Sequence, residues 1–199
     1  MSVDLFLALL AFAFATSVTP GPNNLMLLAS GVNFGFRRSI PHMLGVGLGF
    51  GLMVIVIGLG LGAVFETYPV MHRLLAYGGG TYMLWLAWKI ATTGPVVGEA
   101  KVGSRPMTFL QAALFQWVNP KAWVMAITAV ATYTVASSHA ASVLLVGLTF
   151  VLVNIPSISV WTLSGVAIRR VLTDPRHLRL FNIGMALLLL ASLAPLLKI

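Results

Sequence analysis

Two proline-containing stretches, Thr19–Asn24 and Gln116–Lys121, interrupt long apolar segments with polar side chains. In each stretch a residue that commonly caps helices precedes a proline. Proline is favoured at the first position of a helix, because its missing N–H would have had no partner there. The sequence therefore predicts that new half-helices start at Pro20 and at Pro120, each with the preceding residue as its cap.

The beginning of a helix exposes unpaired N–H groups and a partial positive charge, and both attract a carboxylate. The carbonyl groups that end the preceding half-helices, around Ser17 and Gln116, could receive an ammonium group. A zwitterionic amino acid carries both groups. We therefore predict a substrate-binding site built from Thr19, Pro20, Gly21, Pro22, Asn23, Asn24, Gln116, Asn119, Pro120, Lys121 and Asn154.

The alternative is that these prolines only bend packed helices, as a single transmembrane proline usually does. Two capped breaks that also carry asparagines and a lysine favour a site instead. Asn154 belongs to another apolar segment, where lining a cavity and bonding to a neighbouring helix explain it equally well.

Lys121 is the one ionisable residue that the sequence places deep within an apolar segment. A lysine at the centre of a membrane costs roughly 2.5–3.5 kcal/mol, so it should face a cavity or a partner. It could pair with a substrate carboxylate or carry a proton. It could also be a structural link to a carbonyl or an asparagine of the first segment.

The segments that must position these residues follow from composition. Hydrophobic residues make up 59% of the 199 residues and charged residues only 8%, far from the balance of soluble domains. A bilayer core needs about 20 residues of helix. Five charge-free windows lie at 5–36, 39–65, 74–88, 122–168 and 180–197; the third is short, and the fourth is long enough for two passes. They predict an all-α integral membrane protein with helices at about 4–33, 40–64, 69–92, 107–135, 141–168 and 179–197.

The two breaks lie about one hundred residues apart, once in each half of the chain. Because each half has three helices, the second half enters the membrane with inverted orientation. Paired interruptions in inverted halves point to the binding site of a transporter. We expect one transmembrane domain over residues 1–199, with repeats at about 1–93 and 107–199, a cytoplasmic loop at 94–106, and discontinuous first and fourth helices.

Lysine and arginine are distributed unevenly between the loops. Nine lie in the first, third and fifth loops, against Arg73 and Lys198 on the other side. Since positive loops face the cytoplasm, both termini should lie outside it.

Several classes of function are excluded. The chain has no cysteine, and therefore no disulfide, thiolate catalysis or cysteine-ligated metal. Its four carboxylates lie at segment ends or in loops, and it has no nucleophile–base motif and no phosphate-binding loop. The net charge of +8 is scattered between apolar runs and forms no nucleic-acid patch. We expect no enzymatic activity, no cofactor, no metal and no nucleic-acid partner.

The second predicted helix is rich in glycine, with several Gly-x-x-x-Gly spacings between Gly45 and Gly62. Such spacing permits close helix packing. It favours packing inside the fold, and it leaves open a homodimer face or a surface that slides during transport. His42, near one end of this helix, could titrate, although a lone histidine at an interface is usually structural.

The stretch Thr19–Asn24 resembles the signature of the LysE/RhtB family of bacterial amino-acid exporters. Other stretches fit the same pattern in order along nearly the whole chain: Gly35-Phe36-Arg37, Gly45, Gly79–Tyr82, Leu86–Lys89 and Asn119–Lys121. The Gly-Phe-Arg-Arg and Trp-Leu-Ala-Trp-Lys-Ile-Ala stretches are most similar to the cysteine and O-acetylserine exporter subgroup. One departure is Gly78-Gly79-Gly80, where the family more often has an alanine, and this bears on the packing of the third helix.

The resemblance implies a multi-pass protein of the bacterial inner membrane that exports amino acids or close derivatives, driven by the proton gradient. Homoserine, threonine and leucine remain alternatives to cysteine and O-acetylserine. Together with the paired breaks, it predicts an alternating-access exporter whose partners are a small amino acid and membrane lipid. The alternative from another class is a non-transporting assembly or scaffold subunit.

Overall fold

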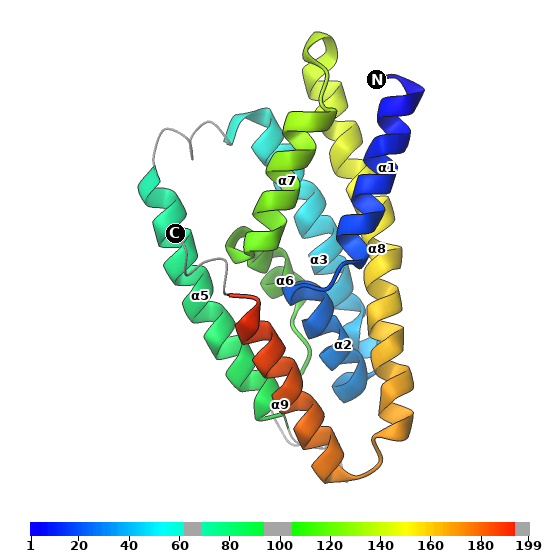
Figure 1. Ribbon diagram of the computed structural model, residues 1–199, viewed down its shortest axis with the longest axis vertical. Coiled ribbons are helices and arrows are strands. Elements are labelled where there is room, and N and C mark those ends of the chain that lie inside the picture. The colour runs from blue at the N-terminus through cyan, green and yellow to red at the C-terminus, as the bar shows by residue number, and fades with distance from the viewer. Residues whose placement is uncertain (62–68, 94–104, 194–199) are drawn as a thin grey trace.

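The computed structural model describes residues 1–61, 69–93 and 105–193, and within these ranges the regular structure is entirely helical. The α-helices are α1 (Val3–Val18), α2 (Pro22–Phe34), α3 (Phe36–Val56), α5 (Pro69–Ala91), α6 (Phe109–Phe115), α7 (Pro120–Tyr133), α8 (His139–Val171) and α9 (Pro175–Ala191). Three short helical segments join them: η1 (Ile57–Leu61), η2 (Gln116–Val118) and η3 (Ala136–Ser138). Figure 1 shows an elongated bundle in which α8 runs nearly the full length.

The six predicted helical segments correspond to α1 with α2, α3 with η1, α5, α6 through α7, α8 and α9. Both predicted interruptions are present. The predicted end points at 64 and 197, and most of the loop at 94–106, lie outside the described residues.

The first break does not have the predicted caps. Thr19 ends α1, because its backbone N–H donates to the carbonyl of Ala15. Its hydroxyl donates to the same carbonyl, which completes the last turn of α1. The N-cap of α2 is Gly21, and Pro22 is the first helical residue. The prediction that α2 starts at Pro20 with a Thr19 cap is therefore wrong.

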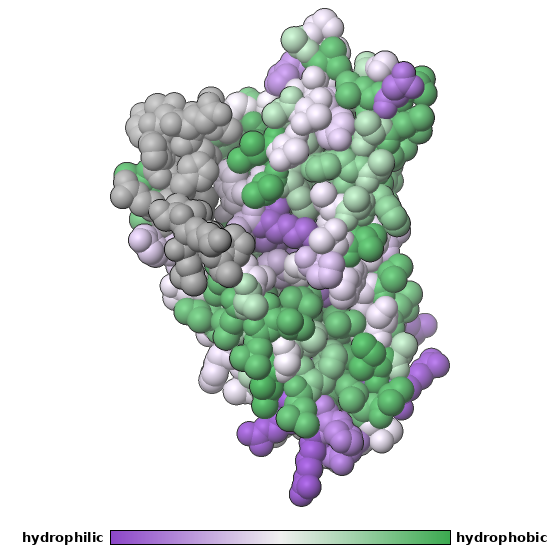
Figure 2. All heavy atoms as spheres, viewed as in Figure 1, coloured by the Kyte–Doolittle hydropathy of each residue, from purple (hydrophilic) through white to green (hydrophobic). Residues whose placement is uncertain are grey.

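Two helical segments, Phe36–Leu61 and Ala136–Val171, are each long and apolar enough to cross a membrane. The pair α1 and α2, bent by 54° at its break, makes a third if it counts as one span. Figure 2 shows hydrophobic residues over much of the visible face, with hydrophilic ones at the two ends and at one spot near the middle. Exposed residues such as Leu52 and Leu152 belong to this apolar surface. The fold is that of an all-α membrane protein.

Glycines let two pairs of helices approach closely, and each pair joins one half of the chain to the other. Between α2 and α8, a methyl group on Gly31 would lie 2.1 Å from the carbonyl oxygen of Thr162. Between α3 and α6, one on Gly45 would lie 2.3 Å from the carbonyl oxygen of Phe109. The glycines of α3 therefore pack inside the fold, which is the interpretation that the sequence favours.

Basic residues gather at one end of the bundle. Arg37 and Arg38 open α3, Arg169 and Arg170 lie in the last turn of α8, and Arg179 follows in α9. These helix ends lie together at the lower end of Figure 1, opposite the N-terminus. We call this the basic end.

Candidate functional site

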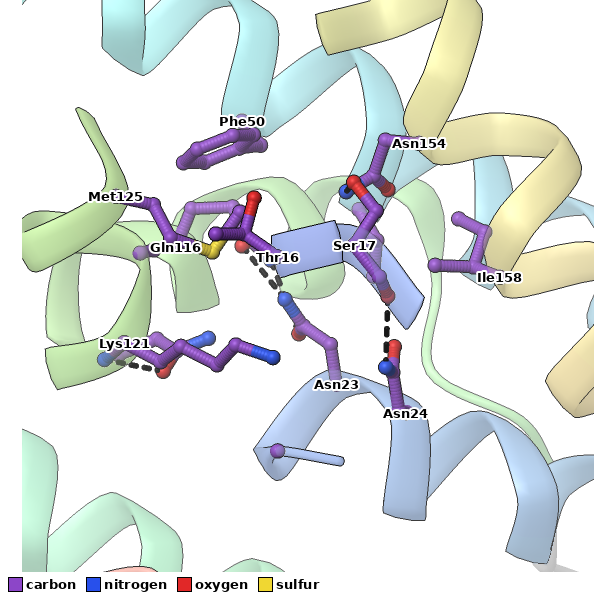
Figure 3. A pocket seen from close by; sticks show the side chains of 14 residues that line it. Thr16, Ser17, Asn23, Asn24, Phe50, Gln116, Lys121, Met125, Asn154 and Ile158 are labelled. Atoms are coloured by element: carbon purple, nitrogen blue, oxygen red, sulfur yellow. Dashed lines mark hydrogen bonds between the residues drawn. The ribbon is translucent and has the colours of Figure 1, made fainter. Parts of the chain in front are cut away.

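A cavity lies midway along the bundle, where the two breaks meet (Figure 3). We call it the central cavity. Its volume is about 20 Å³, close to what one ordered water needs, so it must widen to hold an amino acid. Its lining comes from α1, α2, α3, η2, α7 and α8, and consists of Thr16, Ser17, Gly21, Asn23, Asn24, Val46, Phe50, Gln116, Asn119, Lys121, Ala122, Met125, Asn154 and Ile158.

The carbonyl groups that end α1 are paired with side chains. Asn24 donates from Nδ2 to the carbonyls of Ser17 and Thr19, at 2.9 Å each. The indole N–H of Trp161, on α8, donates to the carbonyl of Val18 at 3.2 Å. The last carbonyls of a helix have no partner within it, and here the neighbouring helices supply one. The Ser17 carbonyl, predicted to receive an ammonium group, already accepts from Asn24.

A pair of amides connects the two breaks. Asn23 donates from Nδ2 to Oε1 of Gln116 at 2.8 Å, and Gln116 donates back from Nε2 to Oδ1 of Asn23 at 3.2 Å. Gln116 is fully buried and also donates to the carbonyl of Ala112. Ninety-three residues separate the two amides in sequence, so this pair holds the halves of the chain together at the cavity.

Lys121 extends from the start of α7 across to the first break. Its ammonium group donates to the carbonyl of Thr19 at 2.5 Å. Its alkyl chain passes directly over Gly21, where a Cβ would lie 2.6 Å from Cδ of the lysine. Glycine at position 21 therefore leaves the space that Lys121 occupies.

The second break has the predicted cap. Asn119 is 1% exposed and precedes Pro120, the first residue of α7. Its Oδ1 accepts from the N–H of Lys121 at 3.1 Å. The start of α2, in contrast, has glycine as its N-cap and no side-chain hydrogen bond. The first-turn N–H groups of α2 and the positive end of its dipole can therefore attract an anion at the central cavity.

Asn154 lies on the other side of the central cavity from Lys121 (Figure 3). It is 6% exposed and donates from Nδ2 to Oγ of Ser17 at 3.3 Å. Its Oδ1 has no hydrogen-bond partner. Because buried polar atoms are normally paired, this oxygen can accept a donor from a molecule in the cavity.

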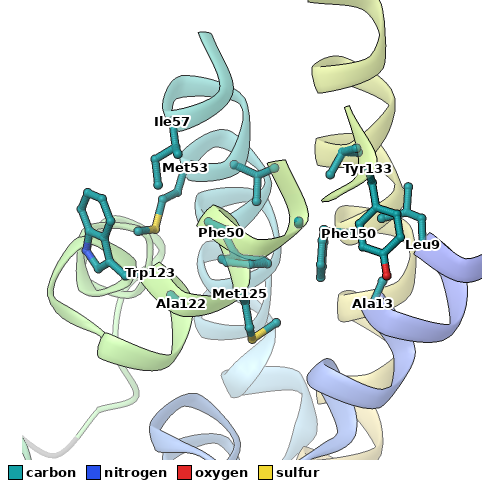
Figure 4. Close-up of a cluster of buried hydrophobic side chains, with 14 residues drawn as sticks. Leu9, Ala13, Phe50, Met53, Ile57, Ala122, Trp123, Met125, Tyr133 and Phe150 are labelled. Atoms are coloured by element: carbon teal, nitrogen blue, oxygen red, sulfur yellow. The ribbon is translucent and has the colours of Figure 1, made fainter. Parts of the chain in front are cut away.

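Apolar clusters lie on both sides of the cavity. The first cluster joins α1, α3, α7 and α8 around Phe50 and Phe150, whose rings meet edge to face at 5.1 Å (Figure 4). The second cluster joins α2, α3, α5, α6, α8 and α9 and contains Val46 and Ile158. The polar groups of the cavity thus form a thin layer between two apolar ones.

The structure brings seven of the eleven predicted site residues to the central cavity: Gly21, Asn23, Asn24, Gln116, Asn119, Lys121 and Asn154. Thr19 and Pro20 are exposed, Pro22 is buried in α2, and Pro120 is half-buried, and none of the four lines the cavity. Thr19 contributes through its carbonyl alone.

Sequence reasoning did not assign the apolar lining and Thr16 to the site. Phe50, Met125 and Ile158 have the same character as ordinary core residues, and no local signal separates them from the core. Within the described ranges, no three residues of the His, Cys, Asp and Glu types come close enough to hold a metal. The polar groups of the lining can bind and orient a zwitterion through hydrogen bonds and through the charge of Lys121.

The chain is similar to known proteins over nearly its whole length. The LysE type translocator family matches residues 14–197. A cysteine/O-acetylserine efflux protein of Escherichia coli O139:H28 is 33% identical over 192 residues, which cover 96% of each chain. The proteins of the same name from Escherichia coli K12 and Shigella sonnei are 33% identical over 191 residues, 95% of each chain.

No solved structure matches the chain. The family and these relatives point to a transporter of the membrane and away from an enzyme. With its family match over nearly the whole sequence, this chain belongs to the LysE family of translocators.

Proposed function

We propose that this protein exports a small amino acid or a close derivative across the bacterial inner membrane. The observation that carries the proposal is the central cavity, in which the uncapped start of α2 and the ammonium group of Lys121 lie opposite the unpaired oxygen of Asn154. Cysteine and O-acetylserine are the first candidates, because the relatives carry those names. Homoserine, threonine and leucine are the others.

The substrate carboxylate binds at the first turn of α2 and to Lys121, where the helix dipole and the ammonium group both favour negative charge. The substrate ammonium group donates to Oδ1 of Asn154, which has no other donor. The side chain of the substrate then faces Phe50, Met125 and Ile158. This closely packed apolar wall favours a short side chain over a long or charged one.

The position of the central cavity between two apolar clusters supports alternating access. Each cluster closes one side, so parting one while the other stays packed exposes the site to one face of the membrane at a time. The Asn23–Gln116 pair and the bond from Lys121 to Thr19 span the two breaks. A bound carboxylate competes with the Thr19 carbonyl for Lys121, which links binding to movement between the breaks.

Six crossings in two inverted halves account for the reciprocal packing of α2 on α8 and α6 on α3. In this topology the basic end faces the cytoplasm, and both termini lie outside it. A reporter fused after Ile199 should be active outside the cytoplasm, whereas fusions within 94–105 and 171–178 should report the cytoplasm. Cytoplasmic signal from the Ile199 fusion would exclude this topology.

The experiment that tests the function is flux from vesicles containing the purified protein. Cysteine, O-acetylserine, threonine, homoserine and leucine are loaded one at a time, with and without a pH gradient. We expect efflux of at least one of them above that of empty vesicles, and faster efflux with the gradient. If none of the five is transported, the assembly-subunit alternative is favoured. If the rate of efflux is the same with and without the pH gradient, transport is not coupled to protons.

A further inference from the structure

A second cavity lies at the basic end, between α2, α3, α5 and the segment that precedes α6. We call it the basic-end cavity. Its volume is about 50 Å³, which is larger than that of the central cavity. Its lining includes Met26, His42, Leu86, Lys89, Arg105 and Met107.

His42 is buried here with its hydrogen-bonding capacity unused. The side chain is 2% exposed, and neither Nδ1 nor Nε2 has a partner. A neutral imidazole needs one donor and one acceptor. The sequence suggested an interfacial histidine, but the ring is enclosed, because α3 turns this face toward α2 and α5.

The polar groups around His42 are already satisfied. Asn33 and Asn182 exchange hydrogen bonds at 2.8 and 3.0 Å, and Asn182 also donates to the carbonyl of Thr93. The hydroxyls of Ser30 and Ser39 bond to each other at 2.7 Å. These neighbours leave no group directed at the ring, so its partner has to come from a molecule in the cavity.

Two cations line the same cavity nearer to solvent. Lys89 is half-buried with its ammonium group 5.1 Å from the ring centre of Trp85, and Arg105 is exposed. The structure describes two of the four carboxylates, Asp4 and Asp174, and neither lines the cavity. The remaining wall is mostly apolar. The ligand that fits is small, carries a carboxylate for the cations, and has a group that hydrogen-bonds to His42.

One apolar layer separates the two cavities. Met26, Leu86 and Met107 line the basic-end cavity and belong to the second cluster. Val46 and Ile158 of that cluster line the central cavity. The helix α2 contributes residues to both cavities: Asn23 and Asn24 to the central cavity, and Met26, Ala29, Ser30, Asn33 and Phe34 to the basic-end cavity. A solute in the basic-end cavity therefore has one packed layer to pass.

We propose that the basic-end cavity is a second binding site for small organic carboxylates, which loads the solute before it enters the central cavity. The role in loading rests on the proposed export function, whereas binding of a carboxylate does not. The carboxylate lies at Lys89 and Arg105, and His42 bonds to a polar group of the same solute. Parting of the second cluster then joins the two cavities.

The test uses full-length protein labelled with ¹⁵N-histidine in phosphatidylcholine nanodiscs, with the His42 signals assigned from a His42→Gln sample. The probe is O-acetyl-L-serine, and its methyl ester serves as the matched compound without a carboxylate. We expect the His42 signals to shift saturably with the acid and to stay in place with the ester. Unmoved signals with both compounds would overturn the site, because the ring would then have only water as its partner.

Charge variants show whether the carboxylate lies at this cavity. Lys89→Gln should weaken binding about tenfold, as expected for loss of a charged contact. Arg179→Gln is the matched control, since Arg179 is exposed at the same end and does not line the cavity, and its effect should stay within about twofold because exposed charges are screened. Equal effects of the two variants would contradict the site. A shift caused by phosphatidylglycerol in place of the solute would also contradict it, because the ligand would then be a lipid headgroup.

Two further variants test whether His42 is only structural and whether the bound solute lies in the central cavity instead. His42→Leu should keep or raise Tm, because it removes two unpaired buried nitrogens. A clear fall in Tm, with binding of O-acetyl-L-serine retained in equilibrium dialysis, would identify a structural ring and overturn the proposal. Lys121→Met should leave the His42 shift unchanged even where flux is lost. If none of the five solutes is transported but O-acetyl-L-serine still shifts the His42 signals, the export function is wrong and the second binding site stands.

Discussion

The two breaks in the helices look alike in sequence but satisfy their backbone groups differently. At the second break, Asn119 caps α7 with its own side chain, and the cap is complete within three residues. At the first break, Gly21 has no side chain to cap α2, and the end of α1 depends on Asn24 and Trp161. The second break is therefore locally complete. At the first break, Asn24 and Trp161 pair the carbonyls that end α1, whereas the N–H groups that begin α2 stay uncapped.

In the proposed binding mode, the two breaks have different parts. The second supplies the side chains that reach across, Lys121 and Gln116, from a firmly capped support. The first supplies the uncapped backbone N–H groups of α2 and Gly21, which leaves room for the side chain of Lys121. The proposed carboxylate site thus combines the ammonium group of Lys121 from one half of the chain with the start of a helix from the other.

Removing the bridging cation should have the largest effect. Lys121→Met should insert at normal levels but reduce flux roughly 10- to 100-fold, because the substrate carboxylate loses a charged hydrogen bond. Lys121→Arg should also be impaired, since a planar guanidinium does not reproduce a compact ammonium group. Flux is measured in vesicles and normalised to the amount of inserted protein.

Val124→Met is the matched control for this variant, because Val124 lies on the same helix and is 67% exposed on its outer side. Its flux should equal that of the unchanged protein. If Lys121→Met also retained full flux and only lost thermal stability, the lysine would be a structural link to the Thr19 carbonyl and the comparison of the breaks would lose its functional meaning.

Adding a side chain at Gly21, where Lys121 passes over the first break, should have an intermediate effect on flux. Gly21→Ala places a methyl group 2.6 Å from Cδ of Lys121. This clash should displace the ammonium group from the Thr19 carbonyl and lower flux roughly three- to tenfold. Gly184→Ala, in α9, meets no atom within 4 Å, and should leave flux unchanged and raise stability by about 0.5–1 kcal/mol. Equal flux in the two variants would show that the contact over Gly21 is irrelevant to transport.

The cap residues should give the smallest effect and the sharpest contrast between the breaks. Asn119→Ala should lower the free energy of unfolding by about 1 kcal/mol, because it removes a helix cap, with a modest loss of flux. Thr19→Ala should cost less than about 0.5 kcal/mol, because its hydroxyl bonds only within α1 and the residue is exposed. Thermal unfolding in detergent measures both. A larger loss for Thr19→Ala would restore the symmetric capping that the sequence suggests.

Where interactions are local, the sequence was a sufficient guide. Charge-free windows placed the helical segments, because a long apolar run without charge is stable only inside the protein or in lipid. Asn119 and Pro120 identified the start of α7, since a cap bond spans two or three residues. The assignment of Thr19 as a cap failed because the same residue also suits the last turn of α1, where its N–H and hydroxyl both find the Ala15 carbonyl.

The sequence by itself determined the helical segments, the two breaks and the presence of a lysine at one of them. Only the tertiary structure decided that Lys121 meets the carbonyl of Thr19, 102 residues away, and that Asn23 pairs with Gln116. It also decided that His42 is enclosed and that Oδ1 of Asn154 is left without a donor. The physical reason is that backbone preference is set by neighbours along the chain, whereas the pairing of a buried polar group depends on which distant helix packs against it.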